Sequence, residues 1–221
     1  MPSLVIRSIV AIGTLVLAVS AVGAAETDAP VSKPEVKVGD SWTYRWIDYV
    51  TTTERTTFKA SVTFVGADVI LLVSTFPKQE TSDLERDSSW TSEWNARGTS
   101  TGRVYQPHSG MLRFPLKPGA TYETKFELAA QRGSTVHTKY EATVKVVGWE
   151  DVVVPAGKFR ALKVEARGTF QRLDISAKGW IKQDFWYVPE VKRWVKWTFG
   201  QGNSSRHTDN GHELVEFDVQ R

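Results

Sequence analysis

Four tryptophans stand where they could bind a ligand. Trp90 and Trp94 lie in a polar segment whose pattern does not predict burial. Trp186 and Trp194 flank one predicted turn, and Tyr187 follows the first of them. Exposed aromatic rings on a sheet stack on sugars, and a curled sheet lined by them can hold an acyl chain. We treat these five residues as candidate ligand-binding residues, with burial in the core as the alternative, because large aromatic side chains are usually buried.

The other reactive side chains form no catalytic or metal-binding signature. The chain has no cysteine, and therefore no thiol nucleophile, and it contains no G-x-S-x-G, P-loop or dinucleotide motif. His207, Asp209 and His212 share one polar stretch, but a metal site needs three or four convergent ligands at defined spacing. A serine–histidine–acid triad has no fixed spacing and stays open. We expect a protein that is not an enzyme, with no catalytic residue, no metal and no cofactor.

One turn organises the second half of the chain. Three β-branched residues, 152–154, favour a strand that stops at Pro155, which lacks an N–H for the ladder. Gly157 can adopt a positive φ, and an alternating run restarts at Phe159. The pattern predicts a hairpin in which Pro155 and Gly157 set the turn and Phe159 packs.

The first residues predict an export signal. Arg7 precedes an uncharged run over residues 8–25 that ends in small residues, which is typical of a secretory signal peptide over residues 1–24. Cleavage after Ala25 is a near equal, and a retained membrane anchor is the alternative, because the run approaches spanning length. Without a cysteine near this point, attachment through a lipidated cysteine is excluded. Residues 25–36, with two prolines among polar residues, are interpreted as a tether or an edge segment.

Composition narrows the classes of partner. The formal net charge is +3 and one arginine leaves with the leader, so the mature chain is nearly balanced. A dedicated nucleic-acid surface would be strongly and locally basic, so none is expected. An exported chain of this size without disulfides must rely on core burial. We expect a periplasmic or secreted protein whose partners are a lipid or a glycan of the cell envelope, and which meets the membrane only through an uncleaved leader.

The body of the chain has the pattern of an all-β protein. Phe58, Ala60, Val62 and Phe64 alternate with polar residues, as in an antiparallel strand with one buried face. The same reading gives strands over residues 111–114 and 191–199, a helical turn or loop over 83–93, and a polar loop over 200–211. No helical period is visible beyond the leader. The sum is roughly ten to twelve antiparallel strands.

The chain also repeats itself. Residues 37–46 match 117–126, residues 58–66 match 140–148, and residues 105–107 match 187–189, always about eighty positions apart. We predict an antiparallel meander duplicated in tandem, residues 37–114 and 117–199, followed by a C-terminal strand. The two copies would form a single all-β domain over residues 37–221, as a curled sheet or open barrel preceded by an N-terminal signal helix.

The motifs of the second copy are similar to those of a known family. They stand as Val154-Pro155-Ala156-Gly157-Lys158-Phe159, Trp186-Tyr187-Val188-Pro189 and Val195-Lys196. These resemble uncharacterised exported proteins of the domain-of-unknown-function 3108-like type, over residues 116–219. The family's usual glycine after the W-Y-x-P turn is absent, and Glu190 stands there instead. The resemblance implies an exported, β-rich protein and brings no established activity.

These observations favour one function over two others. The first is an exported, non-enzymatic β protein that binds an apolar or amphipathic envelope ligand in a curled-sheet concavity. The second is a carbohydrate-binding module or envelope scaffold that works through surface aromatics, which predicts that Trp90, Trp94 or Trp186 is exposed and coplanar with its neighbours. The third is a hydrolase of unrecognised type, which requires a contact between a histidine and an acid.

Overall fold

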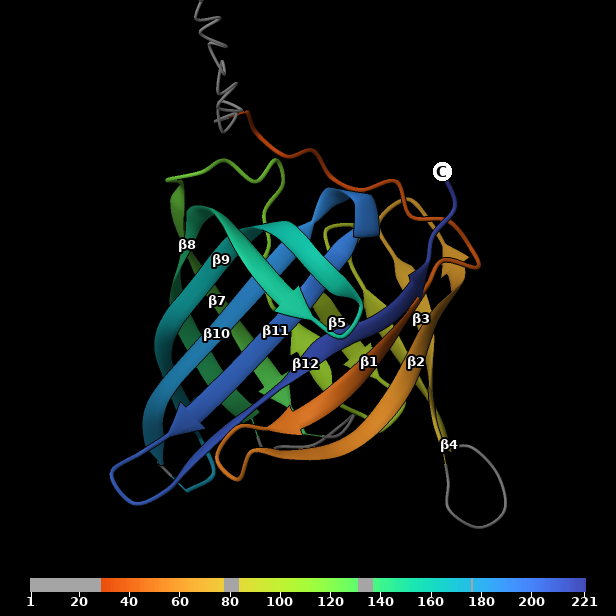
Figure 1. The fold of residues 1–221 in the computed structure, drawn as a ribbon. Coiled ribbons are helices and arrows are strands. Elements are labelled where there is room, and N and C mark those ends of the chain that lie inside the picture. Colours follow the sequence, from red (N-terminus) through yellow and green to blue (C-terminus); the bar gives the residue numbers. More distant parts are fainter. Residues whose placement is uncertain (1–28, 78–83, 131–136, 176) are drawn as a thin grey trace, which may run out of the picture.

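The strands of this protein close into a single antiparallel barrel. The computed structural model describes residues 29–77, 84–130, 137–175 and 177–221. Within these ranges each strand pairs with its neighbours in the sequence, and β12 pairs with β1 (Figure 1). The all-β class and the meander order are therefore confirmed. The expectation of a curled sheet or open barrel is wrong, because the pairing of the last strand with the first closes the barrel and leaves no edge.

The elements follow the chain without a crossover. The strands are β1 Ser41–Asp48, β2 Thr53–Val65, β3 Ile70–Phe76, β4 Leu84–Trp90, β5 Ala96–Thr99, β6 Val104–Gln106, β7 Thr121–Ala129, β8 His137–Val154, β9 Gly157–Arg172, β10 Lys178–Val188, β11 Arg193–Gly202 and β12 His207–Asp218. A single 3-10 turn, η1 Pro189–Val191, joins β10 to β11.

Three local predictions are corrected. Strand β4 occupies the segment expected as a helical turn or loop, where it pairs with β3 over its whole length. Residues 111–114, expected as a strand, form a loop whose Met111 and Leu112 are buried. The polar loop expected over 200–211 shrinks to residues 203–206, because β11 and β12 pair as far as Gly202 and His207. The expected signal helix, residues 1–24, lies outside the described residues.

The hairpin predicted at Pro155 is confirmed and continues beyond the barrel wall. Val154 pairs with Gly157, whose φ is 133°. The tip of β8–β9 crosses the outer surface of β10 to β12 (Figure 1). The Ala156 N–H donates to the Leu214 carbonyl at 3.0 Å, and the Phe159 ring lies 6.3 Å from that of Phe217. We call this tip, residues 148–163, the flap. It gives the barrel a second layer on one side.

The two predicted copies share one local turn. Gly39 donates to Val62 and Gly119 to Val146, and both glycines have a positive φ. In each hairpin an aromatic pair follows on the inner face: Tyr44 lies opposite Phe58, and Phe126 opposite Tyr140. The third matched block falls at the end of β6 in one copy and at the end of β10 in the other, which are not equivalent strands. The duplication itself stays a prediction.

The described part of the predicted tether packs on the barrel. Val31 forms a two-way backbone bridge with Leu116 at 2.8 Å, and Val36 is buried. This segment and the C-terminus lie at the same end of the barrel (Figure 1). Within the described residues, no helix has the length and apolarity needed to cross a membrane.

A buried carboxylate holds the seam where the barrel closes. Glu213 of β12 accepts hydrogen bonds from Arg45 of β1 at 2.7 Å, from Lys196 of β11 at 2.9 Å and from the Tyr49 hydroxyl at 3.0 Å. Burial alone would raise the pKa of Glu213, but the hydrogen bonds from Arg45, Lys196 and Tyr49 outweigh it and hold the pKa below its ordinary value. The charged network therefore links three neighbouring strands across the seam.

This network predicts a loss of stability in acid. Because the folded-state pKa of Glu213 is lowered, its contribution is complete above the unfolded value and disappears as the pH falls through the folded one. In urea unfolding at neutral pH, Glu213→Gln should lower the unfolding free energy by about 2 kcal/mol. It should also show a smaller further loss in acid than the wild type does. Glu216→Gln, on the exposed face of the same strand, is the matched control. Equal behaviour of the two variants would contradict the network's role.

Candidate functional site

The barrel interior has two unlike halves. A barrel of eight strands is just filled by its own side chains, so twelve strands enclose more space than theirs can fill. At the end that carries the termini, residues 91–95 and 109–116 supply the missing volume, and we call them the plug. The Asn95 amide donates to the Leu112 carbonyl at 2.7 Å and accepts from its N–H at 2.9 Å, which ties both plug segments together. Phe114 packs edge-on against Tyr187.

Beside the plug, an arginine lies among aromatic rings. Arg193 is only 5% exposed. Its guanidinium carbon lies 4.4 to 5.7 Å from the centres of five rings, which we call the aromatic cage: Trp42, Tyr44, Trp90, Trp94 and Trp194. Burial disfavours its charge and lowers the pKa of Arg193, but a guanidinium stays protonated in proteins. The cage therefore surrounds a permanent positive charge.

The other half of the interior, toward the β9–β10 and β11–β12 turns, is lined by two rows of rings. We call it the mouth half. One row runs across β6 to β9 and the other across β3, β2, β12 and β11; they are Tyr105, Phe126, Tyr140, Phe170 and then Phe76, Phe58, His212, Trp197, Phe199. Only Phe58 and Phe126 are buried, and the other seven keep a larger part of their surface accessible. The mouth half is thus apolar and incompletely filled.

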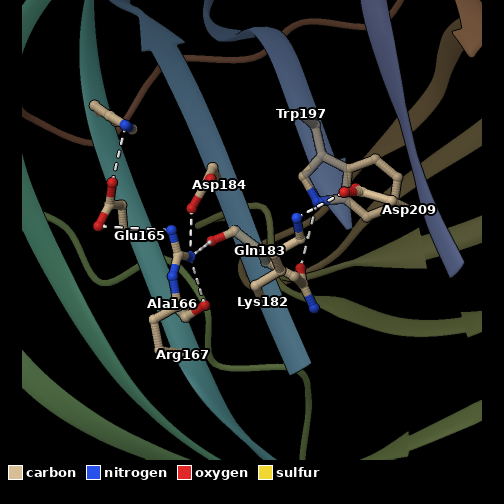
Figure 2. Close-up of polar contacts among 9 residues, drawn as sticks. Glu165, Ala166, Arg167, Lys182, Gln183, Asp184, Trp197 and Asp209 are labelled. Carbon is tan, nitrogen blue, oxygen red and sulfur yellow. Dashed lines mark hydrogen bonds and ion pairs between the residues drawn. The ribbon is translucent and has the colours of Figure 1, made fainter. Parts of the chain in front are cut away.

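Few polar groups enter the mouth half. Burial and, to a smaller extent, the nearby charge of Arg193 together lower the pKa of His212 to about 3, so the imidazole is neutral at physiological pH. The Trp197 indole donates to the Gln183 side chain at 3.3 Å (Figure 2). The Trp46 indole nitrogen is buried without a hydrogen-bond partner. The lining therefore offers donors and aromatic surface but no internal carboxylate among these residues.

A cavity opens at the mouth, between the ends of the β9–β10 and β11–β12 hairpins. Its volume is about 450 Å³, within the range of small-molecule sites. Phe170, Gln201 and Thr208 line it from within the barrel, and Arg172 and Arg206 lie at its edge. Arg172 is paired with Asp174 at 2.5 Å. The cavity therefore combines aromatic surface inside with two arginines at its edge, one of which is already paired with a carboxylate.

The structure brings together three of the five candidate ligand-binding residues. Trp90, Trp94 and Trp194 belong to the cage, and Trp94 is 1% exposed. Tyr187 is buried against the plug. Trp186 lies on the outer face, where its indole donates to Glu150 of the flap at 2.5 Å. The planes of Trp90 and Trp94 meet at 73°, so these two rings form no flat platform for a sugar.

The polar stretch considered for a metal forms no ligand set. His207 and His212 lie on β12, at its start and in its interior, and Asp209 pairs with Lys182 at 2.6 Å (Figure 2). No group of three or more metal-ligating side chains occurs in the described ranges. Figure 2 also shows the outward ion pairs of β9 and β10, in which Arg167 reaches Asp184 and Glu165. His137 contacts Glu127 at 3.2 Å between neighbouring strands.

The fold has solved relatives. No family model and no curated protein matches the chain. Two crystal structures share its architecture. One, from Parabacteroides distasonis, is provisionally named a lipoprotein; it is 11% identical, with a TM-score of 0.58 over 86% of this chain and 100% of that chain. The other, from Bacteroides fragilis, is provisionally named an exported protein with YmcC-like fold; it is 13% identical, with a TM-score of 0.53 and the same coverage.

At these identities the likeness shows the fold alone. The resemblance to the domain-of-unknown-function 3108-like type is not matched by a family model and stays a prediction. The residues that sequence reasoning missed are Arg193 and most of the ring rows of the mouth half; His212 was considered only as a possible metal ligand in a polar loop, and it lies among the rings instead. Arg193 follows a charged turn, and most arginines lie at the surface, so nothing in the local sequence indicated that it is buried. The period-two pattern of β7, β8 and β9, in which Phe126, Tyr140 and Phe170 share a face with buried residues, was a usable signal for one of the rows.

Proposed function

We propose that this protein is an exported, non-enzymatic barrel that binds an apolar or amphipathic molecule of the cell envelope in its mouth half. The observation that carries the proposal is the incomplete burial of seven inward-facing side chains that line one half of the barrel. Apolar side chains that face the inside of a fold are normally packed against others. Here the plug fills one end only, and a ligand in the other would complete the packing.

The localisation of the protein outside the cytoplasm is part of the proposal. The leader pattern over residues 1–24 supports a periplasmic or secreted protein, and the provisional names of the two solved relatives agree with export. A concavity for an apolar guest is useful where lipids must cross an aqueous compartment. The absence of a recognisable catalytic motif supports binding rather than catalysis.

A space-filling substitution tests the location of the site. Thr208 lines the cavity, and a tryptophan there should occupy it without removing a core contact. We expect Thr208→Trp to weaken the binding of the uncharged probe N-phenyl-1-naphthylamine, followed by its fluorescence, about tenfold, or about 1.4 kcal/mol. The matched control is Thr169→Trp, on the exposed face of β9.

Three outcomes decide the matter. The proposal holds if the wild type and Thr169→Trp bind the probe alike and Thr208→Trp binds it more weakly. It fails if the wild-type chain does not bind the probe. It also fails if Thr169→Trp has the same effect as Thr208→Trp, because the probe would then sit on the outer surface.

A further inference from the structure

Arg193 lacks the hydrogen-bond acceptors that a buried guanidinium needs. Its Nε and Nη1 atoms are buried without a partner, and it forms no ion pair with any carboxylate in the described part of the chain. The cage rings attract the positive charge through their faces. Ring faces accept N–H hydrogens only weakly, and the N–H hydrogens in the guanidinium plane form a fork suited to a carboxylate or phosphate.

Neighbouring groups share this excess of donors. The Trp194 indole nitrogen, on the ring nearest to Arg193, and the Trp46 indole nitrogen, beside His212, are also buried without partners. The Tyr44 hydroxyl donates its hydrogen to the Trp194 carbonyl at 2.7 Å, so it supplies no further donor. Buried polar groups in folded proteins are nearly always satisfied. Several unsatisfied donors, with no carboxylate bonded to them among the described residues, therefore indicate a missing acceptor.

The position of Arg193 indicates how such an acceptor is attached. Arg193 begins β11, and the rings of Trp197 and Phe199 follow it along the strand toward the mouth. A molecule that enters from the mouth meets aromatic surface first and the guanidinium last. We propose that the ligand is a single-chain amphiphile that enters head first, with its carboxylate or phosphate oxygens bound by Arg193 and the Trp194 indole. Its apolar chain then occupies the mouth half. This inference rests on the proposed function.

Matched amphiphiles separate the head group from the chain. Dodecanoate, dodecyl phosphate and dodecanol share one apolar chain, and each is titrated against bound N-phenyl-1-naphthylamine. Inorganic phosphate alone serves as the chainless anion. In the wild type we expect dodecanoate or dodecyl phosphate to displace the probe at a concentration at least about tenfold lower than dodecanol does. Whichever of the two binds more tightly identifies the head group.

Variants of Arg193 and of the cage residue Trp194 test whether the cage causes the preference for anionic amphiphiles over dodecanol. Arg193→Met keeps an unbranched side chain of similar length without the charge, and it should abolish the advantage of the anions while leaving dodecanol and probe binding within about twofold. Trp194→Phe keeps a ring without the indole N–H and should reduce the advantage in part. Should Arg193→Met fail to fold, Arg193→Lys, which keeps the charge but loses the fork, and Trp194→Phe carry the test.

The outcomes are separable from those of the proposed function. A wild type that binds the probe but prefers neither anion over dodecanol overturns this inference and leaves the proposed function standing. An anion preference that survives both Arg193→Met and Trp194→Phe overturns the assignment to the cage. If inorganic phosphate binds as tightly as dodecyl phosphate, the apolar chain contributes nothing to binding, and the proposal of an amphiphilic ligand is overturned. A wild type that binds no probe and no amphiphile overturns both proposals.

Discussion

Asp40→Ala is expected to lower the free energy of unfolding by about 3–5 kcal/mol. Asp40 is completely buried and accepts hydrogen bonds from the N–H of Lys37 at 2.9 Å, from the N–H of Gln220 at 2.8 Å and from the Lys192 ammonium at 3.0 Å. These partners precede β1, follow β12 and join β10 to β11. One carboxylate therefore fastens the segments that meet where the barrel closes. Removing it leaves the largely buried charge of Lys192 without its carboxylate.

Urea unfolding followed by circular dichroism measures this loss. Asp218→Ala, at the exposed end of β12, is the control and should change the unfolding free energy by about 0.5 kcal/mol or less. The double variant Asp40→Ala with Lys192→Met should recover part of the loss, because the unpaired charge is then gone. A loss of less than about 1 kcal/mol for Asp40→Ala would show that the contacts of the Asp40 carboxylate do not stabilise the closure of the barrel.

Trp94→Ala should have an effect of similar size, about 3–5 kcal/mol. Trp94 is buried in the plug, packs edge-on against Trp42 with ring centres 5.5 Å apart, and donates its indole N–H to the Lys192 carbonyl at 2.8 Å. Its removal leaves a ring-sized hole and an unsatisfied carbonyl. The matched control is Trp180→Ala, on the outer face of β10, which should cost about 1 kcal/mol or less.

The same pair of variants separates packing from sugar recognition. If Trp94 were a surface platform for a glycan, Trp94→Ala would leave the unfolding free energy near that of Trp180→Ala. If Trp94→Ala loses no more unfolding free energy than Trp180→Ala does, the packing of the plug does not stabilise this end of the barrel. The measurement needs only equilibrium unfolding of three proteins under one set of conditions.

Local pattern was sufficient for the strands with an alternating apolar face and for the best-defined turn. The alternation of Phe58, Ala60 and Val62 reports which face of β2 is buried, because side chains of a strand point to opposite faces in turn. Phe64, which was expected on the same face, is exposed, because the register of β2 shifts between Val62 and Phe64. Pro155 and Gly157 specified their hairpin through backbone conformation alone. Strand β4 was missed because its exposed, polar residues carry no apolar period; it is held by its pairing with β3.

Closure and the site depend on contacts that a local pattern does not encode. The pairing of β1 with β12 joins residues such as Tyr44 and Leu214, and the local sequence of neither strand predicts which strand it pairs with. The polar surroundings of Trp94 suggested exposure, yet neighbouring Asn95 is itself buried through its two hydrogen bonds to Leu112. The position of Arg193 inside the barrel follows from the assembled sheet, which surrounds it with rings from β1, β4 and β11.

The indole N–H signals in a two-dimensional ¹H–¹⁵N NMR spectrum test the central claim most directly, because the nine tryptophans are distributed inside and outside the barrel. Each signal is assigned by a single Trp→Phe substitution, and the chain without its predicted leader, residues 25–221, is titrated with N-phenyl-1-naphthylamine. A guest in the mouth half should shift the signals of Trp46 and Trp197 through the ring current of the probe and leave those of Trp180 and Trp186, on the outer face, in place. Shifts confined to Trp180 and Trp186, or no shift at all, would contradict a ligand site inside the barrel.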